Sequence, residues 1–164
     1  MSRSLGPRLP AELLARLSQT DLAAHLGKAI PLITLDAEGR PHPMLLSSLE
    51  VRAADPRTIR IVIGTGSRSA RNLAERRVAT LLLVEPEQTV YVKAQTRTGP
   101  LLLEDLPGCG LFVLGVEDVL EDAPAEWESG LRISGGLRYA PTPSLDAPWA
   151  RAILKALTAP PGAH

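Results

Sequence analysis

The feature that most restricts the fold of this chain is a series of short apolar segments joined by very short polar turns. Residues 29–36 (AIPLITLD) and 42–53 (HPMLLSSLEVRA) flank a turn in which Gly39 can adopt a positive φ. Pro56 lies in a second turn, ADPR, before the next apolar segment. Turns this short join antiparallel neighbours, because a parallel connection needs a crossover of a dozen or more residues. The spacing therefore favours an antiparallel barrel over a parallel sheet.

The later segments extend the same pattern to about six strands. Residues 58–64 (TIRIVIG) alternate, with three isoleucines on one side, which predicts a half-buried strand. Residues 78–84 (VATLLLV) are apolar almost throughout, which predicts a strand covered on both faces. We expect further strands at 89–96, with a continuation beyond a bend at 99–100, at 109–122, and at 133–139 (ISGGLRY).

Helical spacing occurs near both ends of the chain and once in the middle. Leucines within 10–27 predict one or two short helices, and Ser67 is placed to cap a helix in RSARNLAERR. Asp146 is placed to cap a last helix, with Pro148 in its first turn. Its expected buried stripe consists of Trp149, Ile153 and Leu157.

The chain is predicted to be mainly β: one antiparallel split-barrel domain, 1–164, with peripheral helices. We divide it into an N-terminal helical segment (1–28), the barrel (29–140) and a C-terminal helix (144–158). Its 164 residues are enough to bury a core without disulfides. Cys109 is the only cysteine, which excludes an internal disulfide and a cysteine-cluster zinc site and favours a buried structural thiol.

The charge balance and the hydropathy restrict the classes of partner that we expect for the chain. Eighteen basic and eighteen acidic residues give no overall field for nucleic acid or an anionic membrane. No uncharged apolar run approaches the roughly 18 residues of a membrane span. The N-terminus lacks the apolar core of a signal peptide, so we expect a cytoplasmic protein. No metal site is predicted.

The segment that carries the most chemistry is GTGSRSARNLAERRVATLL, residues 64–82. A helix start there offers free backbone N–H groups and a partial positive charge, and the two glycines permit close approach of a ligand. Ser67, Ser69, Arg68 and Arg71 can add donors around one anion. The helix is expected to turn Ala70, Leu73 and Ala74 to the core and to place Asn72 on another side with Arg68 and Arg76.

Local pattern alone does not decide between a phosphate loop and an ordinary turn from strand to helix. No Gly-Lys-Ser/Thr closes the segment, so it is not a Walker A loop. It lacks the third glycine of a dinucleotide fingerprint, and the flanking strands are predicted to be antiparallel.

Three runs together resemble the pyridoxamine 5′-phosphate oxidase-like family of FMN-binding split barrels. They are LITLDAEGRPHPMLLSSLEV, IRIVIGTGSRSARNLAERRVATLLLV and TVYVKAQ, within about residues 29–105. The most specific piece is a strand, then Gly-Ser-Arg with a helix, then a strongly apolar strand. The resemblance implies a homodimer that holds FMN in a cleft between subunits, with the phosphate at this helix start.

The resemblance also implies site residues. Ser67 and Arg68 match the family's Ser-Arg pair, and Thr65 lies in the same approach loop. The strand from Met44 through Leu45, Leu46 and Ser47 resembles the one that runs under the flavin ring.

The chain departs from the family pattern at three cofactor positions. Ser69 stands where the phosphate oxidases carry a lysine, and Pro43 where they place an arginine. Thr89 replaces a glutamine near the flavin. The C-terminal Trp, Arg and His signature for pyridoxal phosphate is absent, which argues against pyridoxamine phosphate oxidation itself. Arg68 and Arg71 are expected to compensate for the two missing cations.

Other residues give weaker indications. His42 is a possible ligand, acid or polar edge residue, and a haem-binding relative would make His25 or His42 an axial ligand. The acidic residues between Glu117 and Asp122 are expected to be solvated surface, and Gly135-Gly136 a tight bend or close chain approach.

The leading functional expectation is an FMN-dependent oxidoreductase acting on a small molecule, with no essential acid or base identified. The alternatives are a non-catalytic dimeric module that stores or has lost the cofactor, and a relative that uses a deazaflavin or haem.

Overall fold

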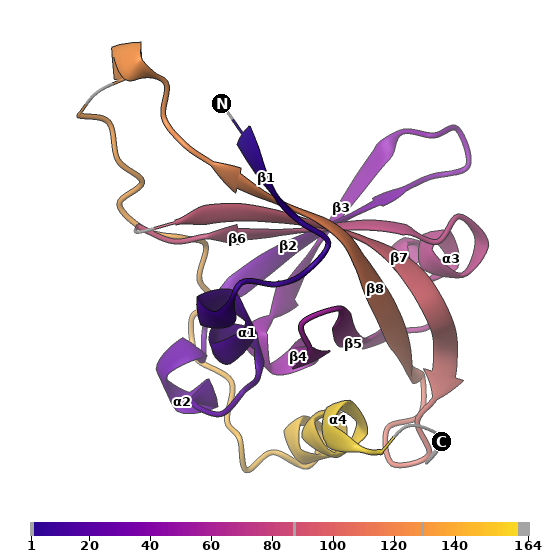
Figure 1. The fold of residues 1–164 in the computed structure, drawn as a ribbon. Coiled ribbons are helices and arrows are strands. Elements are labelled where there is room, and N and C mark those ends of the chain that lie inside the picture. Colours follow the sequence, from indigo (N-terminus) through magenta and orange to yellow (C-terminus); the bar gives the residue numbers. More distant parts are fainter. Residues whose placement is uncertain (1, 87, 129, 161–164) are drawn as a thin grey trace.

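A computed structural model describes residues 2–86, 88–128 and 130–160. One antiparallel sheet of eight strands dominates it, in the order β3-β2-β6-β7-β8-β5-β4, with β1 paired to β8 (Figure 1). The antiparallel split-barrel class expected from the sequence is confirmed. The strands are β1 (Ser2–Gly6), β2 (Ala29–Leu35), β3 (Pro41–Ser47), β4 (Val51–Asp55), β5 (Thr58–Gly64), β6 (Val78–Val84), β7 (Thr89–Leu102) and β8 (Cys109–Asp122).

In the part of the chain that the structure describes, four α-helices and two short 3-10 helices surround the sheet. The α-helices are α1 (Ala11–Leu17), α2 (Leu22–His25), α3 (Arg68–Glu75) and α4 (Pro148–Thr158), and the 3-10 helices are η1 (Ser48–Glu50) and η2 (Glu126–Glu128). In Figure 1, α1 and α2 lie on one side of the molecule, α3 on the other and α4 below. No helix in the described ranges is long and apolar enough to span a membrane.

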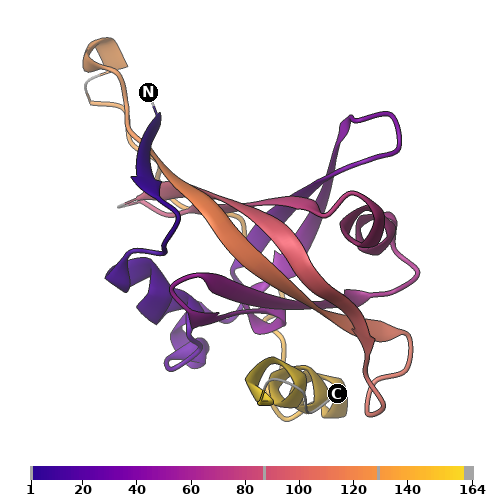
Figure 2. The same cartoon turned by 45° about the vertical axis from the view of Figure 1, so that its right-hand side comes forward.

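β7 and β8 form a long, curved hairpin in the middle of the sheet, seen running diagonally in Figure 2. Its register shifts three times, between Lys93 and Ala94, Thr96 and Thr98, and Thr98 and Leu101. Such bulges bend and twist a strand pair. Gly99 has a φ of 131°, and a Cβ there would lie 2.8 Å from the carbonyl oxygen of Leu111. The bend expected at Gly99-Pro100 therefore requires glycine.

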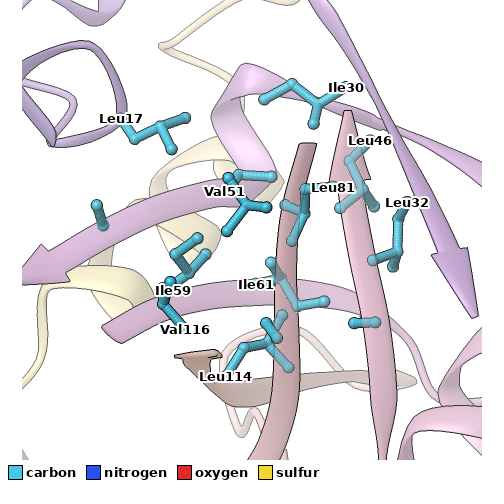
Figure 3. Close-up of a cluster of buried hydrophobic side chains, with 14 of the residues drawn as sticks. Leu17, Ile30, Leu32, Leu46, Val51, Ile59, Ile61, Leu81, Leu114 and Val116 are labelled. Atoms are coloured by element: carbon cyan, nitrogen blue, oxygen red, sulfur yellow. The ribbon is translucent and has the colours of Figure 1, made fainter. Parts of the chain in front are cut away.

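The interior of the curved sheet holds the main hydrophobic cluster, part of which Figure 3 shows. Alternate residues of β2, β5 and β6 point into it, and α1 and α3 close it with leucines and an alanine. A second cluster lies between α4 and the other side of β5, where Val62 and Leu111 meet Ile153 and Leu157.

Several predicted elements differ from the structure. The predicted return strand 42–53 is two strands separated by η1, and the predicted strand ISGGLRY forms only an isolated bridge between Lys28 and Arg138. The chain also begins with β1, which pairs with β8. The described residues therefore form eight strands where about six were expected. The reason is that β1 and η1 depend on distant partners, which local periodicity does not reveal.

The predicted half-buried character of residues 58–64 is wrong, because α4 covers the second face of β5. Val62 is 1% exposed and Arg60 is 8% exposed. The opposite error occurs at β6: only Ala79, Leu81 and Leu83 are buried, so the strand is covered on one face and not on both.

The last helix begins later than expected. Its N-cap is Ala147 without a side-chain cap bond, so Asp146 does not cap it. Ile153 and Leu157 are buried as predicted, whereas Trp149 is 43% exposed and does not belong to the buried stripe.

Arg60 ties β5 to the end of α4. Its Nη1 donates to the carbonyl oxygens of Leu157 at 3.2 Å and Ala159 at 2.5 Å. These carbonyls belong to the last turn of the helix, where intrahelical donors are missing. The buried guanidinium therefore supplies hydrogen-bond donors to the free carbonyl groups at the C-terminus of α4.

We predict that Arg60→Met lowers the free energy of unfolding by about 2 kcal/mol, because two charge-assisted hydrogen bonds are lost in a buried place. Chemical denaturation of both proteins measures the change. Arg52→Met is the matched control: Arg52 lies opposite Arg60 on β4 and makes no side-chain hydrogen bond within the described residues. The control is expected to change stability by no more than about 0.5 kcal/mol. Equal losses in the two variants would contradict this role of Arg60.

Candidate functional site

The loop between β5 and α3 is fixed to the tip of the β7–β8 hairpin. The amide and the hydroxyl of Thr65 both donate to the carbonyl oxygen of Gly108, at 2.9 and 3.1 Å. The Ser67 amide donates to the Gly64 carbonyl at 3.1 Å, which forms the turn from strand to helix. The Thr65 hydroxyl thus already has an acceptor within the chain.

The start of α3 is capped as its sequence predicts. The Ser67 Oγ accepts a hydrogen bond from the Ala70 amide at 3.1 Å. The first amides of a helix have no intrahelical acceptor, so this cap leaves those of Arg68 and Ser69 without one inside the helix. Together with the helix dipole, they favour an anion at this position.

A hollow of about 340 Å³ lies between α3 and the β2–β3 hairpin. Most of its charges are paired: Arg40 with Asp36 at 3.4 Å and with Glu38 at 3.2 Å, and Arg76 with Glu75 at 2.7 Å. Its lining residues are Asp36, Ala37, Glu38, Arg40, His42, Arg68, Arg71, Asn72, Glu75 and Arg76.

Arg68 and Arg71 are the unpaired cations of this hollow. Both are exposed, and within the described residues neither forms an ion pair. The acids of the hollow are already engaged by Arg40 and Arg76, so two positive charges beside the start of α3 remain without a counter-ion. The hydrogen bonds from Arg40 also hold the pKa of the Asp36 carboxyl below its usual value. This acid therefore stays ionised and paired.

Asn72 joins α3 to the two strands behind it. Its Nδ2 donates to Thr34 Oγ1 at 3.0 Å, and that hydroxyl donates to the His42 carbonyl at 3.2 Å. The expectation that Asn72 lies on another side from the core is wrong: it is 6% exposed, whereas Ala74 is exposed. The helix is rotated because Asn72 finds a buried hydroxyl partner that the helical pattern cannot show.

Ser69 faces the interior. It is 1% exposed, its Oγ has no hydrogen-bond partner within the described residues, and it is not among the residues that line the hollow. Of the residues proposed for the phosphate from sequence, the structure thus brings Arg68 and Arg71 to one hollow and places Ser67 at the cap. The Thr65 hydroxyl is bonded to the Gly108 carbonyl and Ser69 faces the interior, so neither residue lines the hollow.

The three residues expected beneath a flavin ring have different environments. Leu45 is 48% exposed, whereas Leu46 is fully buried in the main core. The amide and hydroxyl of Ser47 both donate to Glu50 Oε2, at 2.7 and 2.9 Å. β3 is an edge strand, so half of its backbone groups have no strand partner. Leu45 and the free edge are thus the parts of this segment open to a ligand.

Thr89 lies away from the start of α3. It pairs with Val84 at one end of β6, whereas α3 leads into Val78 at the other end. The six residue steps from Val78 to Val84 separate these ends by about 20 Å. Thr89 lines a different hollow, with Glu85, Gln88 and Asp122.

The outer face of β3, β2 and β6 is mostly apolar, whereas its continuation on β7 carries Thr89, Lys93 and Gln95 beside Tyr91. The strand register places one set of residues on this face, opposite the core, and apart from Ser47 all are half-buried or exposed. The helices send their buried side chains into the two interior clusters and do not cover it. The set includes Pro31, Ile33, Leu45, Leu82, Val84 and Tyr91.

Two other sequence candidates have clear surroundings. Burial and the charge of Glu50 raise the pKa of the Cys109 thiol, which disfavours a reactive thiolate.

His42 lines the hollow beside Arg68 and Arg71, which the sequence did not indicate. Alternation along 41–47 could have placed His42 on the inner side with Met44, but not beside α3.

No protein-family model matches the chain, and no curated protein matches it in sequence. Solved structures do match. A candidate pyridoxamine 5′-phosphate oxidase from Lactobacillus delbrueckii aligns with a TM-score of 0.54 and 18% identity, over 71% of this chain and 98% of that one. A variant of HupZ from Group A Streptococcus aligns with a TM-score of 0.52 and 13% identity, over 70% and 99%. An FMN-binding protein from Syntrophomonas wolfei aligns with a TM-score of 0.49 and 15% identity, over 70% and 89%.

The first two matches show a shared fold. They confirm, at the level of the fold, the resemblance to the pyridoxamine 5′-phosphate oxidase-like split barrels that the sequence indicated.

We predict that Ser67→Ala lowers the free energy of unfolding by about 1 kcal/mol, because the Ala70 amide loses its acceptor at the helix start. Ser67→Asp is the matched control, since aspartate also caps helices and should retain most of the stability. Denaturant titration measures both. A stable alanine variant with an unchanged midpoint would contradict the cap.

Proposed function

We propose that the chain binds FMN, with its phosphate at the start of α3, and serves as a cytoplasmic flavin-dependent oxidoreductase acting on a small molecule. The observation that carries this proposal is the pair Arg68 and Arg71, whose two charges have no counter-ion among the described residues, in a hollow where the other arginines are paired. A phosphate monoester carries up to two negative charges and accepts charge-assisted hydrogen bonds from guanidinium groups.

The backbone at the helix start fits the same group. The amides of Arg68 and Ser69 are free of intrahelical acceptors, and a Cβ added at Gly66 would meet no atom within 4 Å. The approach to the helix start is therefore open. Ser69 contributes no side-chain donor to the hollow, so the proposed phosphate site relies on two arginines and the helix.

The ring end of FMN would lie along β3. The free edge of this strand offers backbone donors and acceptors, and the exposed Leu45 offers an apolar contact. FMN, when bound, supplies hydride or electron transfer at its ring. The residues of this chain bind the phosphate, orient the ring and exclude water.

We further propose that the protein is a homodimer whose contact is the outer apolar face. This face contains Leu45 and continues across β3, β2 and β6 without a covering helix. Exposed apolar surface of this extent marks an interaction site. A second copy on this face would shield the edge of β3 and so form one wall of the flavin cleft.

The loss of a cation at Ser69 favours a second candidate, a non-catalytic dimer that stores flavin or has lost it. The buried hydroxyl of Ser69 replaces the lysine of the family pattern and does not reach the hollow. A colourless protein that binds no flavin would support this candidate. A yellow protein whose flavin is reduced by NAD(P)H and reoxidised by an acceptor would support the enzyme.

The phosphate site makes a prediction for FMN affinity. Arg68→Gln and Arg71→Gln are each expected to weaken FMN binding about tenfold or more, because each removes a charge-assisted contact. Flavin fluorescence titration measures the dissociation constants. Arg76→Gln is the matched control on the same helix, because Arg76 already pairs with Glu75. Riboflavin, which has no phosphate, should bind all four proteins alike.

Two results would contradict this site. Unchanged FMN affinity in both variants would remove the arginines from it, and equal losses for FMN and riboflavin would show a general disturbance and not a phosphate contact.

The dimer face makes a separate prediction. Leu45→Glu is expected to convert the dimer to monomers at micromolar concentration, because it places a charge in an apolar contact. Light scattering coupled to gel filtration measures the mass. Leu102→Glu is the control, since Leu102 is 72% exposed but lies at the far end of the β7–β8 hairpin. A wild-type monomer, or a dimer unaffected by Leu45→Glu, would rule out this face.

A further inference from the structure

A second basic cavity lies at the opposite end of β6 from α3. It has a volume of about 40 Å³ and lies among the ends of α1 and α2, the start of β2, the end of β6 and residues 136–138. Leu17 and Ile30, at the edge of the core cluster in Figure 3, form part of its apolar wall. Its polar lining comes from Arg16, His25, Lys28, Ser48, Glu85 and Arg138.

The charges around this cavity do not balance. Glu85 is the single acid among the lining residues, and Lys28 Nζ lies 2.7 Å from its Oε1. Neither Arg16 nor Arg138 forms an ion pair with an acid among the described residues. Arg138 donates from Nη2 to the Leu26 carbonyl at 3.4 Å, which satisfies a donor but not the charge. The lining of the cavity, with three cations and one acid, therefore carries a positive excess, and Asp21 acts on His25 from outside the lining.

Two buried nitrogens in this cavity have no partner. Arg16 Nη1 and His25 Nδ1 are both inaccessible to solvent and make no hydrogen bond within the described part of the chain. A guanidinium nitrogen can only donate, so Arg16 Nη1 needs an acceptor. Buried donors are rarely left unsatisfied, and an orphan of this kind indicates a missing partner.

Residues 136–138, which form one wall of the cavity, lie in close contact with the start of β2 and the end of β6. The Ala29 amide donates to the Leu137 carbonyl at 2.9 Å, and Lys28 forms a bridge with Arg138. A Cβ at Gly136 would lie 2.3 Å from the Val84 carbonyl oxygen, so only glycine permits this approach. The close chain approach expected from Gly135-Gly136 is thus found at Gly136.

We propose that this cavity binds a small oxyanion, such as a carboxylate or inorganic phosphate, between the Arg16 guanidinium and the His25 imidazole. The oxyanion supplies the acceptor that Arg16 Nη1 lacks and the negative charge that balances the surplus cation. A cavity of about 40 Å³ has room for a carboxylate group or for ordered water. The positive excess favours the anion over water.

The surroundings of His25 provide a readout. Burial, Lys28 and Arg16 lower the pKa of His25, whereas Asp21 and Glu85 oppose them. Arg138, an exposed residue, also lines the cavity. The imidazole is therefore neutral at neutral pH. A bound anion stabilises the imidazolium and so raises this pKa, and by linkage the anion binds more tightly as the pH falls.

The experiment follows the imidazole signals of the full chain by NMR during titration with sodium formate or sodium phosphate, at constant ionic strength set with chloride. We expect a saturable shift of the His25 signals and a rise in the His25 pKa with at least one of these anions. Formate alone would indicate a carboxylate site, and phosphate a site for larger oxyanions.

Three variants make the test specific. Arg16→Gln is expected to weaken binding at least tenfold. Arg8→Gln removes the same charge from an exposed position next to α1 and should bind as the wild type does. Arg68→Gln disrupts the proposed FMN phosphate site and should leave the His25 response intact, so the two proposals can fail separately.

The proposal is overturned if neither anion gives a saturable shift at His25, or if Arg16→Gln responds as the wild type does. Should Arg16→Gln fold poorly, Arg16→Lys keeps the charge but loses the forked donor, and unchanged binding there would equally overturn the role of Arg16.

Discussion

The pairing of β7 with β8 is the interaction on which the rest of the structure depends, because it alone joins the two halves of the sheet. β6, β2 and β3 are attached through β7, and β5, β4 and β1 are attached through β8. The bulges in this pair curve the sheet around the main core. α3 connects β5 in one half to β6 in the other, so its start must lie where the halves meet. The candidate phosphate site is positioned by this join.

Charge pairing decides which residues of the hollow can serve a ligand. Four arginines line it, and the sequence alone does not show which of them are free to bind a ligand. The structure distinguishes them, because Arg40 and Arg76 are bound to neighbouring acids whereas Arg68 and Arg71 are not. The same reasoning identifies Arg16 in the second cavity, where Lys28 has already engaged Glu85. In both places the free cation, and not the total charge, indicates an anion.

The sequence predicts what local pattern determines. Alternation located the barrel strands, Gly39 its hairpin turn and Ser67 the helix cap. It could not show contacts between distant segments. Arg60 occupies an alternate position typical of solvent, yet α4 covers it almost a hundred residues later. Asn72 is polar within a helix, and only the hydroxyl of Thr34 makes its burial favourable. His25 and Arg16 likewise meet Glu85 only through the closure of the sheet.

The two candidate anion sites lie at opposite ends of β6, and this separation has a consequence for their use. α3 precedes Val78, whereas Val84 and Glu85 line the second cavity. With about 20 Å of strand between them, phosphate and carboxylate groups at the two ends would have no direct contact.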